Sequence, residues 1–399
     1  MANAAPEPRA IPADRIRDVD IYDLPGVEHG VQEAWLKLAN GHEIVWSPHN
    51  GGHWIATSAA VVAQLFRDTE NFSNREIAVP VGSFLIPALP IQADGEAHAA
   101  YRAIIEPGFR PAALDAYTKR ARELTINIIE ELLPAGECEF VSDYTLILPL
   151  VIFLSMVDLP QSDRAELHGY TRVKTHEADL EKRQEAHAAV TDYLERKIAE
   201  RRASPGADLL SHVIQAQVFG RPLTEQEVLG TCSLLLFGGL DTVTSMMAFV
   251  MRFLADHPAH RKWIIDNPSK TSFAVEEIMR RHGVANVMRT AIRDVEIDGT
   301  MIYAGQQVMV ATSLHGLDPR EFDRPDEVDF ERKAKFTGTF GAGPHRCPGA
   351  SLARMEMRVM VEEWLRRIPD YEVDPSRPIV QRSGGVNGLM TLPLRWPSR

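Results

Sequence analysis

The segment Thr339-Phe340-Gly341-Ala342-Gly343-Pro344-His345-Arg346-Cys347-Pro348-Gly349 decides how the rest of the chain is interpreted. Its glycines allow tight turns and close backbone approach, and its prolines fix φ and remove amide donors, so the segment predicts a rigid loop. The apolar-periodic residues 350–368 that follow predict a helix. The N-terminal end of that helix favours a thiolate over a thiol at Cys347, which indicates a ligand or a nucleophile.

The two other cysteines do not support a multi-cysteine metal centre. Cys138 and Cys232 lie far from Cys347 in the sequence, and no Cys-x-x-Cys pair occurs, which argues against zinc or an iron–sulfur cluster. A lone cysteine in a loop is most often an inert thiol. A haem, however, requires only one protein thiolate.

Phe340, Gly343, Cys347 and Gly349 match the pattern Phe-x-x-Gly-x-x-x-Cys-x-Gly. This pattern resembles the haem-ligand loop of the cytochrome P450 family. The resemblance implies a mainly α fold with a minor β region, the cytochrome P450 fold. It also implies haem b (iron protoporphyrin IX) with the thiolate of Cys347 as the axial metal ligand, and with Phe340 and Gly349 among the residues that bind the cofactor.

Two further segments extend the resemblance toward one branch of that family. Residues 29–35 and 50–57 resemble the bacterial camphor hydroxylase and its relatives, which are soluble, and the likeness continues to Trp396. On this interpretation residues 1–30 form an N-terminal surface arm and residues 31–399 form a single cytochrome P450 catalytic domain.

Composition fits a soluble globular protein. The chain has 399 residues, of which 45% are hydrophobic and 25% charged, so apolar material for a core is ample. No basic segment followed by an apolar stretch starts the chain, and the apolar run 146–157 is shorter than the ~20 residues of a membrane span. We therefore expect a cytoplasmic protein that does not bind membranes. A net charge of −12 argues against nucleic acid as a partner.

Periodicity predicts helices with a small sheet. The helical segments are residues 31–39, 59–68, 112–133, 146–159 and 224–254. The strand-like segments are a hairpin formed by 44–46 and 54–57, then 295–299, 301–303 and 307–310, and a hairpin turn at 383–390 that reaches the pocket.

The segment 224–254 predicts a long helix that crosses the interior. Thr224 and Glu227 are spaced as a capping box, and the residues that follow are nearly all apolar. Gly238 and Gly239 in its middle each cost roughly 1 kcal/mol relative to alanine. We expect these glycines to permit a local bulge that opens space for O2 and water.

Asp241 and Thr242 follow the two glycines, where apolar residues are expected. A threonine inside a helix often only bonds back to the carbonyl one turn earlier. Residues 238–242, however, resemble the oxygen-activating segment of the family, which implies that Asp241 and Thr242 are catalytic and deliver the protons required for O–O cleavage. A buried Asp241 needs a cationic partner, which the resemblance places between residues 160 and 190. The candidates there are Arg172, Lys174 and His176.

The resemblance implies that four side chains bind the haem propionates, namely His98, Arg102, Arg289 and His345. A cationic cluster that faces carboxylates is physically reasonable. His98 and Arg102 are also spaced for one face of a helix, so an exposed ion-pairing face is the alternative.

Residues 75–93 mix prolines with apolar side chains and follow no period, which predicts a pocket lid or, alternatively, a loop buried by its neighbours. The substrate-pocket candidates are Ser83, Phe84, Leu85, Phe237, Gly238, Val284, Ala285 and Val287. Camphor hydroxylase carries a tyrosine in this loop that hydrogen-bonds the substrate ketone. The matching residues 82–87 contain none, and Ser83 is a weaker donor.

Glu277 and Arg280 are spaced for an ion pair on one helical face and resemble the Glu-x-x-Arg element that braces the core of the family on the haem side. At the position where the family often adds a third member, an arginine, this chain has Glu327. The sequence therefore lacks the usual third member at this position.

The resemblance implies that four arginines cluster around the cysteine loop and its helix, where we expect a docking surface for an electron donor. They are Arg102, Arg346, Arg354 and Arg358. Because no flavin or second redox domain is encoded, we expect an acidic [2Fe–2S] ferredoxin with its NADH-dependent reductase as partner.

The sequence thus predicts a haem-thiolate monooxygenase that uses O2 and ferredoxin electrons to hydroxylate a C–H bond of a compact hydrophobic substrate, a terpenoid or norisoprenoid. One alternative is a haem-thiolate peroxygenase or isomerase that needs no redox partner, and Asp241 with Thr242 counts against it. A haem or gas sensor is the other, and such a sensor normally brings a signalling domain.

Overall fold

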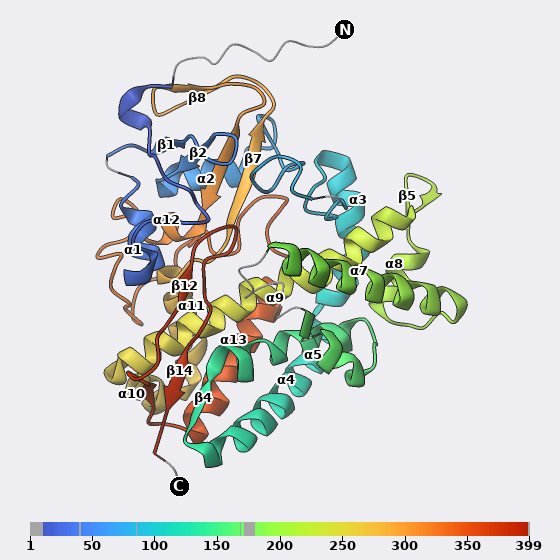
Figure 1. Cartoon of the computed structure of the whole chain (residues 1–399), viewed down its shortest axis with the longest axis vertical. Coiled ribbons are helices and arrows are strands. Elements are labelled where there is room, and N and C mark those ends of the chain that lie inside the picture. The colour runs from blue at the N-terminus through green and yellow to red at the C-terminus, as the bar shows by residue number, and fades with distance from the viewer. Residues whose placement is uncertain (1–10, 40, 85, 168, 171–179, 398–399) are drawn as a thin grey trace.

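A five-stranded sheet occupies one part of the molecule and helices the other (Figure 1). The computed structural model describes residues 11–39, 41–84, 86–167, 169–170 and 180–397. Helices form 52% of the chain, which confirms the predicted mainly α fold with a minor β region.

The larger sheet has the strand order β1-β2-β10-β7-β3. Its strands are β1 (Ile44–Ser47), β2 (His53–Ala56), β10 (Gln307–Ala311), β7 (Asn286–Ala291) and β3 (Phe72–Ser73). The predicted hairpin is confirmed, because β1 and β2 pair antiparallel with Ile44 opposite Ala56. β10 runs parallel to β2 and antiparallel to β7, which places Arg289 opposite Val308 inside the sheet.

Four smaller sheets complete the strands of the described residues. They are β11 (Glu372–Val373) with β14 (Pro393–Arg395) and β4 (Glu137–Glu139), β12 (Gln381–Arg382) with β13 (Gly388–Leu389), β5 (Gln217–Val218) with β6 (Arg221–Pro222), and β8 (Val295–Ile297) with β9 (Thr300–Ile302). The predicted turn at 383–390 is the connection of β12 to β13, and it contacts β7 through the hydrogen bond from Asn286 N to Gly385 O of 2.9 Å.

The α-helices include all the helical segments for which the sequence analysis gave bounds, each within three residues. They are α1 (Val31–Leu36), α2 (Ala59–Arg67), α3 (Gly95–Ile105), α4 (Pro111–Leu132), α5 (Ile147–Met156), α7 (Leu180–Ala203), α8 (Leu209–Gln215), α9 (Glu225–Asp256), α10 (Pro258–Asp266), α11 (Thr271–Arg281), α12 (Thr312–Gly316) and α13 (Ala350–Arg367). Short 3-10 turns occur at Ala13–Arg15, Val27–His29, Glu106–Phe109, Leu133–Ala135, Gln161–Asp163 and Pro268–Lys270, and a π turn occurs at Val141–Thr145.

Helix α9 runs through the middle of the molecule (Figure 1). The predicted capping box is present: Thr224 Oγ1 accepts from Glu227 N at 3.2 Å, and Glu227 Oε2 accepts from Thr224 N at 2.7 Å. By length and composition alone α9 could cross a membrane, but 61% of its most apolar window is buried, and a core helix passes the same test.

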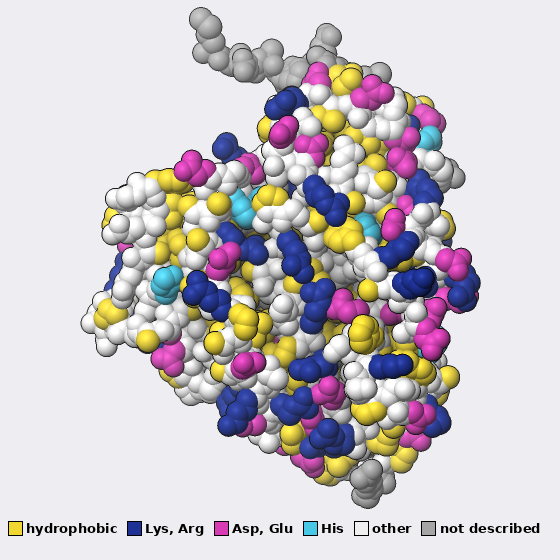
Figure 2. Space-filling view, turned by 180° about the vertical axis from the view of Figure 1, so that it is seen from behind, with side chains coloured by type: hydrophobic (Ala, Val, Ile, Leu, Met, Phe, Trp, Pro, Cys, Tyr) yellow, Lys and Arg dark blue, Asp and Glu magenta, His cyan; other side chains and the backbone are white. Residues whose placement is uncertain are grey.

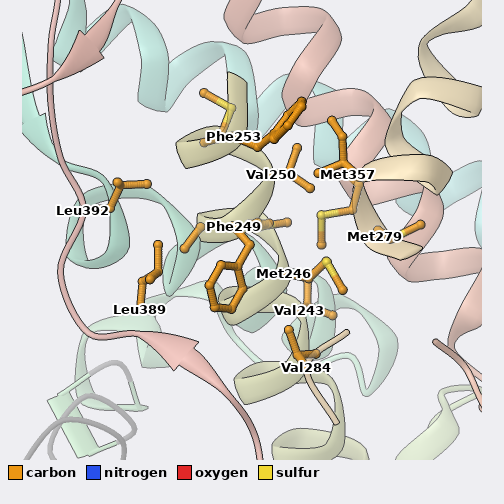
Figure 3. Close-up of a cluster of buried hydrophobic side chains, with 14 of the residues drawn as sticks. Val243, Met246, Phe249, Val250, Phe253, Met279, Val284, Met357, Leu389 and Leu392 are labelled. Atoms are coloured by element: carbon orange, nitrogen blue, oxygen red, sulfur yellow. The ribbon is translucent and has the colours of Figure 1, made fainter. Parts of the chain in front are cut away.

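The bulge expected at the two glycines of α9 is absent, because α-helix continues without a break from Glu225 to Asp256. Apolar packing beyond the glycines offsets their cost. Figure 3 shows Met246, Phe249 and Phe253 of α9 in a cluster with Met279 of α11 and Met357 of α13. Each fully buried side chain of this kind contributes about 1.5–3 kcal/mol.

Two predicted surface segments are partly built into the core. In the described part of the predicted arm, Ile21 and Leu24 are buried in the same core cluster as α9. In the irregular loop 75–93, Val79 and Leu89 are buried whereas Phe84 is 45% exposed. The interpretation of a loop buried by its neighbours therefore holds for the two ends, whereas the tip faces outward and its role as a lid stays a prediction.

Candidate active site

The cysteine loop turns tightly and packs against the end of α2. Cys347 N donates to Phe340 O at 2.9 Å and closes the loop. Gly343 has φ +68°, and a Cβ at this position would lie 2.7 Å from Phe66 O. Only glycine therefore permits this turn at this distance from α2, which explains one of the glycines of the motif.

Cys347 lies three residues before α13, and its side chain is exposed. Burial among surrounding protein atoms nevertheless raises the pKa of the thiol, against the lowering effects of the Gly349 amide and of the charges of Arg102, Arg346 and Arg354. The expectation that the helix end alone would favour the thiolate is thus wrong, because desolvation is the larger effect. A coordinating metal reverses it, since a thiol bound to a metal ion is deprotonated outright.

The four predicted propionate ligands come from three separate segments and meet beside the cysteine loop. The rings of His98 and His345 lie 3.9 Å apart. Arg102 Nη2 donates to Arg346 O at 2.9 Å. Arg289 is 4% exposed, and its charge acts on His345.

The electrostatics of this cluster indicate that an anionic group belongs there. Burial, followed by the charges of His98, Arg289 and Arg102, lowers the pKa of His345 to about 3. Burial also lowers the pKa of Arg289 to about 10. Among the described residues Arg102 Nε and His345 Nδ1 have no hydrogen-bond partner. Buried cations of this kind are costly unless a ligand supplies negative charge, so they fit the two propionates of a haem.

Accessible backbone lies in the middle of α9. Gly238 and Gly239 are exposed although the residues after Leu240 are mostly buried. Thr242 Oγ1 donates to Gly238 O at 2.9 Å, which is the backbone contact considered above as the alternative to a catalytic role. Asp241 Oδ2 lies 4.0 Å from Arg382 Nη2, a cation from β12 that the sequence did not suggest. The expected partners Arg172, Lys174 and His176 fall outside the described residues.

Comparison with known proteins identifies the family. The family described as "Cytochrome P450" matches residues 164–267 and 271–393. The chain belongs to the cytochrome P450 family. The curated "Probable cytochrome P450 127A1" of Sinorhizobium fredii is 32% identical over 98% of this chain and 97% of its own length.

Solved structures agree with this P450 assignment. The crystal structure of cytochrome P450 CYP101C1 is 39% identical with a TM-score of 0.90, covering 97% of this chain and 98% of its own. That of CYP101J2 is 34% identical with a TM-score of 0.87, covering the same shares. The protein is therefore a P450 monooxygenase that carries haem b with an axial thiolate from Cys347 and requires O2 and a redox partner. Bound haem supplies the chemistry of oxygen activation.

The pocket candidates of this P450 differ in how much of each side chain is exposed. Phe237 is partly buried, with its ring 5.8 Å from that of His187. Val284 is 5% exposed and points into the core of Figure 3, so it offers little open surface. Ala285 and Val287 are half-buried, and Val287 shares a face of β7 with Arg289 because strand side chains alternate.

The loop candidates are less well placed for substrate contact. Ser83 Oγ donates to Pro80 O at 2.5 Å, so its hydroxyl hydrogen is already used. Phe84 is exposed, and Leu85 falls outside the described residues.

The P450 brace is larger than predicted. Arg280 Nε and Nη2 donate to the two carboxylate oxygens of Glu277, each at 2.9 Å, which confirms the pair. Arg332 Nε also donates to Glu277 Oε1 at 2.8 Å, so an arginine does complete a triad. For the third member the sequence pointed only to the position of Glu327, whose contribution is the backbone carbonyl that accepts from Arg280 Nη2 at 2.7 Å. The sequence signal for this third member was Arg332, which lies five residues after Glu327.

The predicted arginine surface is partly neutralised. Arg354 pairs with Glu276, Nη2 to Oε2 at 3.2 Å, and lies 4.4 Å from the centre of the Phe340 ring. Arg358 lies 4.0 Å from Glu362. Arg346, in contrast, is exposed. Figure 2 shows basic side chains gathered down the middle of the face opposite to that of Figure 1.

Proposed function

We propose that this P450 hydroxylates a C–H bond of a compact hydrophobic substrate, a terpenoid or norisoprenoid, with electrons from a [2Fe–2S] ferredoxin and its NADH-dependent reductase. The observation that supports the substrate class is the apolar character of the pocket candidates. Phe237 and the half-buried Ala285 and Val287 are apolar, and the hydroxyl of Ser83 donates to Pro80 O. Shape and apolar contact, rather than a polar anchor, would then select the substrate.

We assign the polar residues of the site to cofactor binding and proton delivery. His98, Arg102, Arg289 and His345 would hold the propionates, and the unpaired Arg102 Nε and His345 Nδ1 support this role. The Thr242 hydroxyl donates to Gly238 O, so its oxygen remains free to accept a hydrogen bond from a water that relays protons. The proposed role of Asp241 is to exchange protons with that water.

A panel of ligands tests the substrate class through the Soret band of the haem-loaded protein. Displacement of water from the iron by a bound ligand shifts the spin state and the band. We expect camphor and the norisoprenoid ionone to shift it, whereas a long-chain fatty acid does not. A shift with the fatty acid alone would contradict the proposal.

The missing polar anchor can be tested within the same panel. Camphor and its hydrocarbon analogue camphane differ only by the ketone. A net hydrogen bond contributes about 0.5–1.5 kcal/mol, or about 2- to 13-fold in the dissociation constant, so without an anchor camphor should bind no more tightly than camphane. A tenfold preference for camphor would reveal an anchor that replaces the tyrosine.

The ferredoxin is tested at Arg346, the most accessible arginine beside Cys347. Arg346→Gln should slow reduction by a [2Fe–2S] ferredoxin several-fold and weaken its dependence on salt, because exposed charges mainly steer association. The matched control is Arg202→Gln at the exposed end of α7, where Arg202 pairs with Glu225 at 2.6 Å. Equal reduction rates in both variants and the wild type would rule out docking at Arg346.

A further inference from the structure

The hairpin β12–β13 approaches α9 more closely than side chains normally allow. Arg382 and Gly388 are opposite one another in this hairpin. A Cβ at Gly388 would lie 2.6 Å from Ser245 Oγ of α9. Ser245 is one helical turn beyond Asp241 and so lies on the same face of α9. Glycine at 388 therefore brings the hairpin onto the face of α9 that carries Asp241.

This close approach brings Arg382, the residue opposite Gly388, near the carboxylate of Asp241. Arg382 Nη2 lies 4.0 Å from Asp241 Oδ2, and the two side chains are only 26% and 29% exposed. A pair that is mostly removed from solvent is screened less than a surface pair. The separation is longer than a hydrogen bond, so the attraction between the two side chains is mainly that of their charges.

We propose that Arg382 is a positioning residue that acts through Asp241: its guanidinium fixes the Asp241 carboxylate on the accessible side of α9, next to Thr242. The inference rests on the proposed role of Asp241 in proton delivery. It assigns a charge partner for the acid to the C-terminal hairpin, outside the 160–190 region in which the sequence comparison placed one.

Carbon monoxide bound to the chemically reduced haem is the probe, because its stretching frequency in the infrared reports on the electric field at the site without substrate or ferredoxin. We expect Arg382→Gln to shift this frequency and Arg382→Lys to return it toward the wild-type value. The matched control is Arg377→Gln, which breaks a pair with Asp374 at 3.2 Å in the same C-terminal segment and should leave the frequency unchanged.

Turnover supplies the second readout. With NADH, reductase and a [2Fe–2S] ferredoxin, Arg382→Gln should release more hydrogen peroxide per NADH and lower kcat about fivefold, the size of a favourable, partly buried pair. Gly388→Ala should reproduce both effects, because the new Cβ meets Ser245 Oγ. Adding Ser245→Ala removes the clashing atom and should restore wild-type behaviour.

The outcomes separate this inference from the proposed function. If Asp241→Asn changes neither the frequency nor the peroxide yield, the proposed role of Asp241 fails. If Asp241→Asn changes both and Arg382→Gln changes neither, only the inference about Arg382 fails. A change in Arg382→Gln without one in Asp241→Asn also overturns it, since Arg382 would then act by another route.

Discussion

Replacing Glu277 by glutamine should leave two arginine side chains inside the protein without their counter-charge. The Arg280 side chain is 1% exposed and that of Arg332 is 12% exposed, and both donate to Glu277. Removing one partner of a buried ion pair costs about 3–5 kcal/mol. Unfolding entropy of about 2.1 cal/mol/K per residue gives about 0.84 kcal/mol/K for 399 residues. A loss of about 4 kcal/mol therefore lowers Tm by about 5 °C.

The neighbouring residue provides the control for this stability prediction. Glu276 also pairs with an arginine, Arg354, but the two side chains are 38% and 35% exposed. Glu276→Gln should cost at most about 1 kcal/mol, or about 1 °C. The assay is thermal unfolding of the haem-loaded proteins, followed by circular dichroism and by loss of the Soret band. Equal Tm values for the two variants would refute the argument that burial of the triad sets its contribution.

Three further outcomes follow from the same geometry. Cys347→Ser should abolish the red-shifted Soret band of the carbon monoxide complex, and a variant that keeps this band would disprove thiolate ligation. Gly343→Ala should reduce the haem-to-protein absorbance ratio, because an alanine at φ +68° costs roughly 1–2 kcal/mol and its Cβ would meet Phe66 O. The control Gly385→Ala should leave the ratio unchanged, because a Cβ there has no atom within 4 Å. Burial lowers the pKa of His53 to about 4 in the folded protein, below its unfolded value of about 6.5. The contribution of neutral His53 to stability is therefore complete above about pH 6.5 and is lost as the pH falls toward 4. Between pH 7 and pH 5 the unfolding free energy of the wild type should fall by about 2 kcal/mol more than that of His53→Phe.

Signals that are local in sequence predicted structure well. The capping box at Thr224 and Glu227 placed the start of α9, and the turn around Asn50, which has φ 55°, joined β1 to β2 as expected. The parallel pairing of β10 with β2 was not predicted, because residues about 250 positions apart meet only through the packing of the elements between them. Arg332 and Arg382 were missed for the same reason: each reaches its acid from another element.

The charges of the site explain why its chemistry could be predicted by resemblance but not by electrostatics alone. Burial disfavours charge on both sides of the cysteine loop: it raises the pKa of the Cys347 thiol and lowers that of His345. Each effect taken singly suggests an inert, neutral residue. A ligand that carries both a metal cation and carboxylates reverses them together, because the metal stabilises the thiolate and the carboxylates satisfy Arg102 and Arg289. Haem b is such a ligand, so one cofactor would both pair the donors that the protein leaves unpaired and keep the Cys347 sulfur as a thiolate.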